Sequence, residues 1–153
     1  MDLGVYAMNF MTGLFGRPKE ITASAIKLHN GLDGVGTITA SYETMLATLF
    51  YGKVAPSGNC CEIQGENGYM TIEGLNAPAR VTITYRDGRT EELPLEEIPF
   101  KKDLSYEVQA FIDMIQKGDH SEASFNERTR ISLETMDAAR VQMQMHFPND
   151  DLC

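Results

Sequence analysis

The sequence predicts an α+β domain in which six or seven β-strands form a mostly antiparallel, open sheet, with helices on one face of that sheet. Two observations support this class. The apolar residues near the N-terminus recur with the 3.6-residue period of a helix, and after residue 16 the period changes to the two-residue alternation of strands. Most alternating segments are joined by short turns rich in glycine, asparagine and aspartate, and such hairpin links make neighbouring strands antiparallel.

The first helix is predicted from the apolar residues at positions 5, 8, 10, 11, 14 and 15, and it ends at Gly16, with Pro18 just beyond. The spacing i, i+4, i+7 places Asp2, Tyr6 and Asn9 on one face. A carboxylate, a phenol and an amide are costly to bury for packing alone, whereas a surface that handles a polar substrate needs such a row. In the alternative, structural interpretation, Asp2 caps the first turn, Tyr6 packs at the edge of the core and Asn9 is solvated.

Seven strands are predicted after this helix, because the segments alternate and are rich in small or β-branched residues. They span residues 20–28, 35–43, 46–54, 61–64, 69–72, 79–85 and 90–95. Two further helices are predicted at 105–117 and from 124 to about 146, before Pro148 prevents continuation. We expect residues 1–153 to form a single domain that is long enough to bury a substantial core.

One face of the predicted sheet carries hydroxyl side chains. These are Thr37, Thr39 and Ser41 in one strand and Thr82 and Thr84 in another. Because the face lacks the lysines and glutamates of a typical solvated surface, it is suited to a flat partner. The alternative interpretation is an ordinary solvated face that simply favours β-branched residues.

Composition and charge exclude several classes of partner. A net charge of −9, with only scattered lysines and arginines, argues against nucleic acid and anionic membrane surfaces. No run of eighteen apolar residues and no signal peptide is present, so no membrane association is expected. Three cysteines without a disulfide framework predict a cytoplasmic protein, and three histidines far apart in the sequence predict no metal site.

Three stretches of the sequence form an ordered set of motifs. They are Asp2-x-Gly4-x-Tyr6-x-x-Asn9, then EIQGENGYMTI at 62–72, and finally ETMDAAR at 134–140 with the Phe-Pro pair at 147–148. Together they resemble the glucose–fructose oxidoreductase, inositol dehydrogenase and rhizopine-catabolism (Gfo/Idh/MocA) family over essentially the whole chain. The family helix motif is Asp-x-Gly-x-His/Tyr-x-x-Asp/Asn, and its hairpin motif is E-I-x-G-x-x-G-x-x-x-I. Tyr6 in place of histidine points to the branch that contains glucose–fructose oxidoreductase and dimeric dihydrodiol dehydrogenase.

The resemblance implies that this chain is the C-terminal substrate-binding and dimerisation domain, with a dihydrodipicolinate-reductase-like fold. The Rossmann domain of the family, with its Gly-rich loop and Glu-Lys-Pro segment, has no counterpart in this sequence. The chain would then be either a shortened form of a longer protein or a natural stand-alone domain. NAD or NADP is expected to bind the full-length parent and not this fragment, which is expected to be inactive. The resemblance also implies a homodimer through the open face of the sheet.

The implied reaction transfers hydride between a nicotinamide and a hydroxyl-bearing carbon of a sugar, cyclitol or dihydrodiol. Tyr6 and Asp2 are the implied catalytic residues, with Tyr6 moving the hydroxyl proton and Asp2 orienting the substrate or the tyrosine. Asn9 would bind the substrate. A phenol with an ordinary pKa near 10 is a suitable acid, but as a base near neutral pH it needs a neighbouring cation. In the family, that cation is a lysine of the absent domain.

The sequence is also compatible with two other functions. The first is a non-catalytic ligand-binding or assembly module with the same fold, which requires no Rossmann sequence upstream in the gene. The second is part of an NAD-dependent, redox-assisted glycosidase, because related proteins use hydride chemistry for glycoside cleavage. Further polar groups from the absent domain would distinguish the glycosidase from the dehydrogenase.

Overall fold

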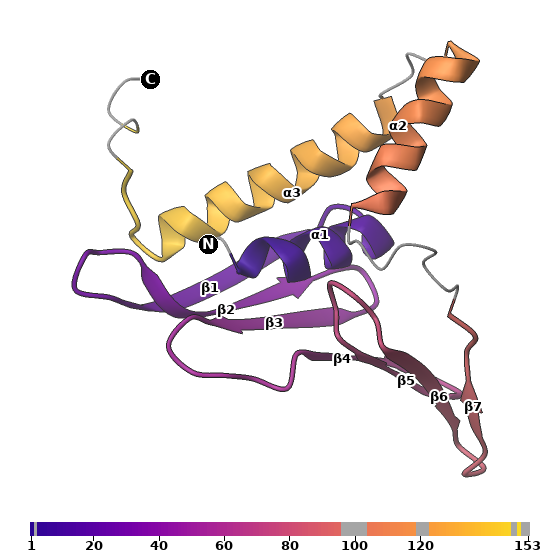
Figure 1. The fold of residues 1–153 in the computed structure, drawn as a ribbon. Coiled ribbons are helices and arrows are strands. Elements are labelled where there is room, and N and C mark those ends of the chain that lie inside the picture. Colours follow the sequence, from indigo (N-terminus) through magenta and orange to yellow (C-terminus); the bar gives the residue numbers. More distant parts are fainter. Residues whose placement is uncertain (2, 96–103, 119–122, 148–149, 151–153) are drawn as a thin grey trace. The chain divides into compact units, whose positions relative to one another are not determined.

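A computed structural model describes residues 1, 3–95, 104–118, 123–147 and 150 (Figure 1). The chain divides into two compact units, one made of Met1–Ser57 with Ala123–Cys153 and the other of Gly58–Glu122. Within the described ranges there are seven strands, all in antiparallel pairs, and three helices. The predicted α+β class is therefore confirmed.

The first unit is a three-stranded sheet with two helices. Its elements are α1 (Gly4–Phe15), β1 (Glu20–Lys27), β2 (Asp33–Ser41), β3 (Leu46–Gly52) and α3 (Ala123–Gln142), and the strand order is β1-β2-β3. The loop between β1 and β2 turns at Gly31, whose φ of 81° favours glycine. In the same loop, the Leu32 N–H donates to Oδ1 of Asn30. These local interactions fix the antiparallel register of β1 and β2.

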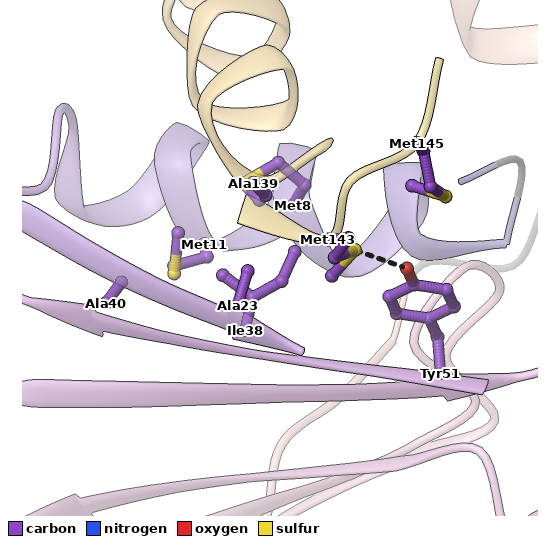
Figure 2. Close-up of a cluster of buried hydrophobic side chains, with 9 residues drawn as sticks. All are labelled: Met8, Met11, Ala23, Ile38, Ala40, Tyr51, Ala139, Met143 and Met145. Atoms are coloured by element: carbon purple, nitrogen blue, oxygen red, sulfur yellow. Dashed lines mark hydrogen bonds between the residues drawn. The ribbon is translucent and has the colours of Figure 1, made fainter. Parts of the chain in front are cut away.

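Helices α1 and α3 lie on one face of this sheet, and the core forms between them and the strands (Figure 1). Alternation places Ala23, Ile38 and Tyr51 on this face, as the two-residue period predicts. Figure 2 shows the whole cluster, which consists of Met8, Met11, Ala23, Ile38, Ala40, Tyr51, Ala139, Met143 and Met145. Four of its nine members are methionines, whose flexible side chains fill irregular spaces between helix and sheet.

The two helices of this unit end in different ways. Helix α1 stops at Gly16 as predicted, with a φ of 73° and its N–H bonded to the Thr12 carbonyl. Helix α3 ends at Gln142, earlier than the predicted end near residue 146, and Gln144 adopts a φ of 54°. This left-handed residue takes the chain off the helix, and Met143 and Met145 on either side of it are both buried.

The second unit contains a four-stranded sheet and one helix. Its elements are β4 (Cys60–Gly65), β5 (Gly68–Glu73), β6 (Arg80–Tyr85), β7 (Thr90–Glu92) and α2 (Ser105–Lys117), and the strand order is β4-β5-β6-β7. The β4–β5 hairpin is tight because Gly68 has a φ of 153°, and a Cβ there would lie 2.2 Å from the Thr84 carbonyl oxygen. No other residue fits this position without displacing β6.

The strands pair as two sheets rather than as the single open sheet expected from the sequence. The connection from β3 to β4 contains Pro56 and Gly58, which interrupt the alternation and lie outside any strand. As a result, the two groups of hydroxyl side chains belong to different sheets. Thr37, Thr39 and Ser41 lie on β2 of the first sheet, and Thr82 and Thr84 lie on β6 of the second. Among the described helices, none is long and apolar enough to cross a membrane.

Candidate active site at the start of helix α1

Helix α1 is held in place by its buried face. Met8, Met11 and Thr12 are all less than 3% exposed. The Thr12 hydroxyl donates to the Met8 carbonyl oxygen at 2.9 Å and lies 2.6 Å from the hydroxyl of Ser132 on α3. Because Thr12 uses its only proton on Met8, Ser132 donates to Thr12. This buried hydrogen bond fixes the rotation of α1 against α3 and so determines which residues face outward.

Two of the three predicted site residues lie on the exposed side of α1. Tyr6 is 55% exposed, and Asn9, one turn later, is also exposed. Within the described part of the chain, no hydrogen bond restrains the Tyr6 hydroxyl. The predicted juxtaposition of Tyr6 and Asn9 is consistent with this helix, while Asp2, the third predicted member, lies outside the described residues. The phenol and the amide together offer a donor and acceptor surface to a polar ligand.

The first residue of α1 is packed against an aromatic ring. A Cβ placed on Gly4 would lie 3.1 Å from Cδ1 of Tyr51, and one placed on Gly36 would lie 2.4 Å from the Tyr51 hydroxyl oxygen. Gly36 is the direct cross-strand partner of Tyr51 in the β2–β3 ladder. The two glycines therefore leave the space that the ring fills between the sheet and the start of α1. Close approach explains why the motif carries glycine at position 4.

A buried carboxylate lies at the same end of the helix. Asp33, the first residue of β2, is 1% exposed, and its Oδ1 accepts a hydrogen bond from the Met1 nitrogen at 3.1 Å. The Lys53 Nζ lies 4.0 Å from the same oxygen. Burial, followed by the nearby negative charge of Asp33, raises the pKa of Tyr51 far above the ordinary value of 10. Tyr51 therefore stays a neutral phenol at physiological pH.

Asp33 is the polar residue that the sequence interpretation missed. The strand predicted at 35–43 leaves Asp33 and Gly34 in the preceding loop, because the Asp-Gly dipeptide is common in turns. In the structure both residues are buried and belong to β2. A single sequence gives no signal for such burial, because a carboxylate at the start of a strand looks the same whether it faces solvent or the core.

The described helix starts do not provide a nucleotide site of the Rossmann type. A pyrophosphate needs a Gly-rich turn at a helix N-terminus, where the missing side chains open space for the ligand. At α1, the space beside Gly4 is occupied by the Tyr51 ring. The start of α1 therefore does not have the geometry of a Rossmann-type pyrophosphate site, and no step of the chemistry is assigned to a dinucleotide on this chain.

The other candidate sites are a metal cluster and a hollow on the second unit. Among the described residues, no group of three histidine, cysteine or acidic side chains could hold a metal ion. On the second unit, a shallow hollow of about 310 Å³ lies at the β4–β5 hairpin and is lined chiefly by apolar side chains and turn residues. Its apolar residues include Ile63, Met70 and Ile83. The hollow is also lined by Glu66, Tyr69 and Tyr85.

Comparison with known proteins identifies a family. A family described as the GFO/IDH/MocA C-terminal domain matches residues 1–71, which include the whole of α1 and the first sheet. The chain is 37% identical over 151 residues to scyllo-inositol 2-dehydrogenase (NADP(+)) IolU of Bacillus subtilis, covering 98% of the chain and 45% of that protein. It is 24% identical to a trans-1,2-dihydrobenzene-1,2-diol dehydrogenase of Oryctolagus cuniculus, covering 98% of the chain and 48% of that protein.

Solved structures agree on the fold. UDP-N-acetylglucosamine 3-dehydrogenase GnnA from Acidithiobacillus ferrooxidans matches 94% of the chain with a TM-score of 0.75 at 18% identity. The match covers 46% of that structure, so the chain spans about half the length of the relatives it resembles. Sequence and fold therefore agree that the chain belongs to the GFO/IDH/MocA family, within the C-terminal domain of its members.

Proposed function

We propose that this chain is the substrate-binding and dimerisation half of an NAD(P)-dependent oxidoreductase that transfers hydride to or from a hydroxyl-bearing carbon. The single observation that carries the proposal is the exposed Tyr6 phenol, which lies with Asn9 on the outward face of a helix anchored by buried contacts. Relatives named as inositol and dihydrodiol dehydrogenases support a polyol, sugar, cyclitol or dihydrodiol as the substrate class.

In the proposed mechanism, Tyr6 handles the proton of the reacting hydroxyl. A nicotinamide cofactor bound outside this chain would supply the hydride chemistry. In the reductive direction the neutral phenol donates its proton to the developing alkoxide, and in the oxidative direction the phenolate accepts the proton. Asn9 donates a hydrogen bond to a neighbouring substrate hydroxyl or accepts one from it. Asp2, whose position is a prediction from sequence spacing, orients the substrate or the phenol.

The proposal includes a homodimer through the outer face of the first sheet. This face, opposite the helices, carries Thr22, Thr37, Thr39 and Thr48 together with three strongly exposed apolar residues. Ile26 is 75% exposed, Leu46 is 73% exposed and Phe50 is 62% exposed. Exposed apolar side chains among neutral hydroxyls are typical of a surface that meets a partner, and a two-fold pairing is the commonest closed symmetry.

We also propose a cytoplasmic location, in which thiols stay reduced. Cys60 and Cys61 are free and at least partly accessible, so an oxidising compartment would expose them to unwanted disulfide exchange. Burial is the main cause that raises the pKa of the Cys61 thiol, so this thiol is a poor nucleophile. The two cysteines are therefore assigned no role in the reaction.

The experiment is the substitution Tyr6→Phe in the intact oxidoreductase that contains this chain. Removing the phenol should lower kcat by about a hundredfold or more, the range found for a general acid or base. Tyr106→Phe is the matched control, because Tyr106 is also on a helix and is 52% exposed. If Tyr6→Phe changes kcat by less than a factor of about three, an effect under 1 kcal/mol, Tyr6 does not transfer the proton and the proposed role fails.

A further inference from the structure

The buried carboxylate of Asp33 is only half satisfied. Oδ1 faces the Met1 nitrogen at 3.1 Å and the Lys53 ammonium at 4.0 Å. Oδ2 is buried and has no hydrogen-bond partner among the described residues. Burying a charged oxygen without a partner is costly, and an apolar residue of similar size would serve packing better. The presence of a carboxylate at this point therefore calls for a purpose other than stability.

Tyr51 packs against the start of helix α1. Its side chain is 6% exposed, and its hydroxyl donates to Sδ of Met143 at 3.6 Å (Figure 2). One edge of the ring lies 3.1 to 3.4 Å from the position that a Cβ on Gly4 would occupy. Any change in the position of this ring is therefore transmitted directly to the first residue of the helix.

From these contacts we infer that Asp33 and Tyr51 are positioning residues, which hold the start of α1 so that Tyr6 is presented at a fixed place. Asp33 holds the backbone before the helix through the Met1 nitrogen, and Tyr51 limits how closely Gly4 approaches the sheet. The inference rests on the proposed function of Tyr6. The inference gives a structural reason for the unsatisfied carboxylate of Asp33 and for glycine at position 4.

The chemistry of Tyr6 makes such positioning necessary. Proton transfer requires donor and acceptor to lie within hydrogen-bond reach, and misplacement by about 1 Å is enough to cost a large factor in rate. Tyr6 is exposed and makes no hydrogen bond to the described residues, so its side chain has no restraint of its own. Its position is therefore determined by the helix two residues earlier, at Gly4.

The first test compares two glycine substitutions on the same helix. In Gly4→Ala, the new Cβ meets the rigid, buried ring of Tyr51. In the matched control Gly13→Ala, the Cβ meets only the guanidinium of Arg128, the far end of an exposed and flexible side chain. Alanine favours helix more than glycine at both positions, so helix propensity does not distinguish the two variants.

The readout on this chain is the NMR signal of the Tyr6 ring. We expect its ring shifts to move in Gly4→Ala and to stay unchanged in Gly13→Ala, with both variants folded by circular dichroism. Unchanged Tyr6 shifts in Gly4→Ala overturn the inference, whatever the kinetics. This measurement does not depend on catalytic activity, so it separates the positioning role from the role of Tyr6 itself.

The second test is kinetic and uses the intact oxidoreductase. Asp33→Ala should lower kcat at least tenfold while the KM for the nucleotide stays within a factor of two. Asp33→Asn keeps an oxygen to accept from the Met1 nitrogen and should recover kcat to within threefold of the unmodified enzyme. If Tyr6→Phe lowers kcat but Asp33→Ala does not, the positioning inference is wrong and the proposed function stands.

Discussion

At the scale of single residues, a hydrogen bond between two buried hydroxyls joins the candidate site to the rest of its unit. Thr12 and Ser132 are 2% and 3% exposed, and their hydroxyl oxygens are 2.6 Å apart. Neither residue stood out in the sequence, because serine and threonine on a helix are usually solvated. Their burial arises only when α1 and α3, distant in sequence, pack against each other.

We predict that Thr12→Val destabilises the chain by about 1 to 3 kcal/mol, because the Ser132 hydroxyl is left buried without its acceptor. The double variant Thr12→Val/Ser132→Ala should recover part of this loss. Urea unfolding of both single variants and the double variant gives the coupling energy, which should exceed about 0.5 kcal/mol. Additive effects would show that the two hydroxyls do not interact in solution.

Some residues of the candidate site can be predicted from the sequence, and others are recognised only in the structure. Tyr6 and Asn9 were found because helical spacing alone places them on one face. Asp33 was missed because its burial depends on contacts with Met1 and Tyr51, which come from other parts of the chain. Gly4 was recognised as part of a motif, but its reason, the ring of Tyr51, became visible only in the fold.

At the scale of elements, the helices and strands follow from periodicity, whereas their ends depend on contacts. Helix α1 ends where predicted because Gly16 carries its own stop signal. Helix α3 ends early because two methionines on either side of Gln144 enter the core, and no local signal announces this. Likewise, the seven strands were predicted, but hydrogen-bonded pairing divides them into two sheets.

The segment after α3 is held by a carboxylate, which makes its attachment sensitive to pH. Asp150 accepts a hydrogen bond from the Phe147 N–H at 2.8 Å and pairs with Arg140. The Phe147 N–H first, and then the Arg140 guanidinium, lower the pKa of Asp150 below its ordinary value of 3.8. The stabilisation is therefore present above the ordinary pKa and is lost as the pH falls through the lowered pKa.

We predict that the Phe147 amide signal in NMR changes only in strong acid, at a pH below about 3.8. In Asp150→Asn, the signal should already be shifted at neutral pH, and the acid transition should be absent. Following this one amide isolates the Asp150 contact from the titration of other carboxylates. A transition that persists unchanged in Asp150→Asn would assign it to another group.

At the scale of the whole molecule, the outer face of the first sheet predicts self-association. We expect a homodimer of about 34 kDa, twice the 17.0 kDa chain, in light scattering at high micromolar concentration. A standard interface buries about 1,600 Å² in total. Thr39→Lys places a charge at the centre of the face and should produce a monomer. Thr44→Lys, in the exposed turn after β2, is the control and should remain a dimer.

Light scattering that returns a monomer for the unmodified chain would contradict the dimer and assign the threonine-rich face to solvent. Of the two strands whose hydroxyl faces were predicted to pair with a partner, only β2 belongs to the sheet of the proposed interface. Thr82 and Thr84 lie on β6 of the second sheet and are not part of the proposed interface.

We predict that this chain by itself binds neither NAD(H) nor NADP(H), because no described helix start offers the open, Gly-rich turn that a pyrophosphate needs. Isothermal titration calorimetry of the isolated chain with each nucleotide should show no binding heat. The intact oxidoreductase serves as the positive control. Micromolar binding by the isolated chain would contradict the assignment of the nucleotide site to another part of the protein.

The central claim is that Tyr6 moves the proton of the reacting hydroxyl, and the pH dependence of kcat/KM in the intact oxidoreductase tests it most directly. Tyr6→Phe should lose most of its kcat/KM, and the pH profile that remains should differ in shape from that of the unmodified enzyme. A profile of unchanged shape in Tyr6→Phe, at an activity within about threefold of the unmodified enzyme, would contradict the claim.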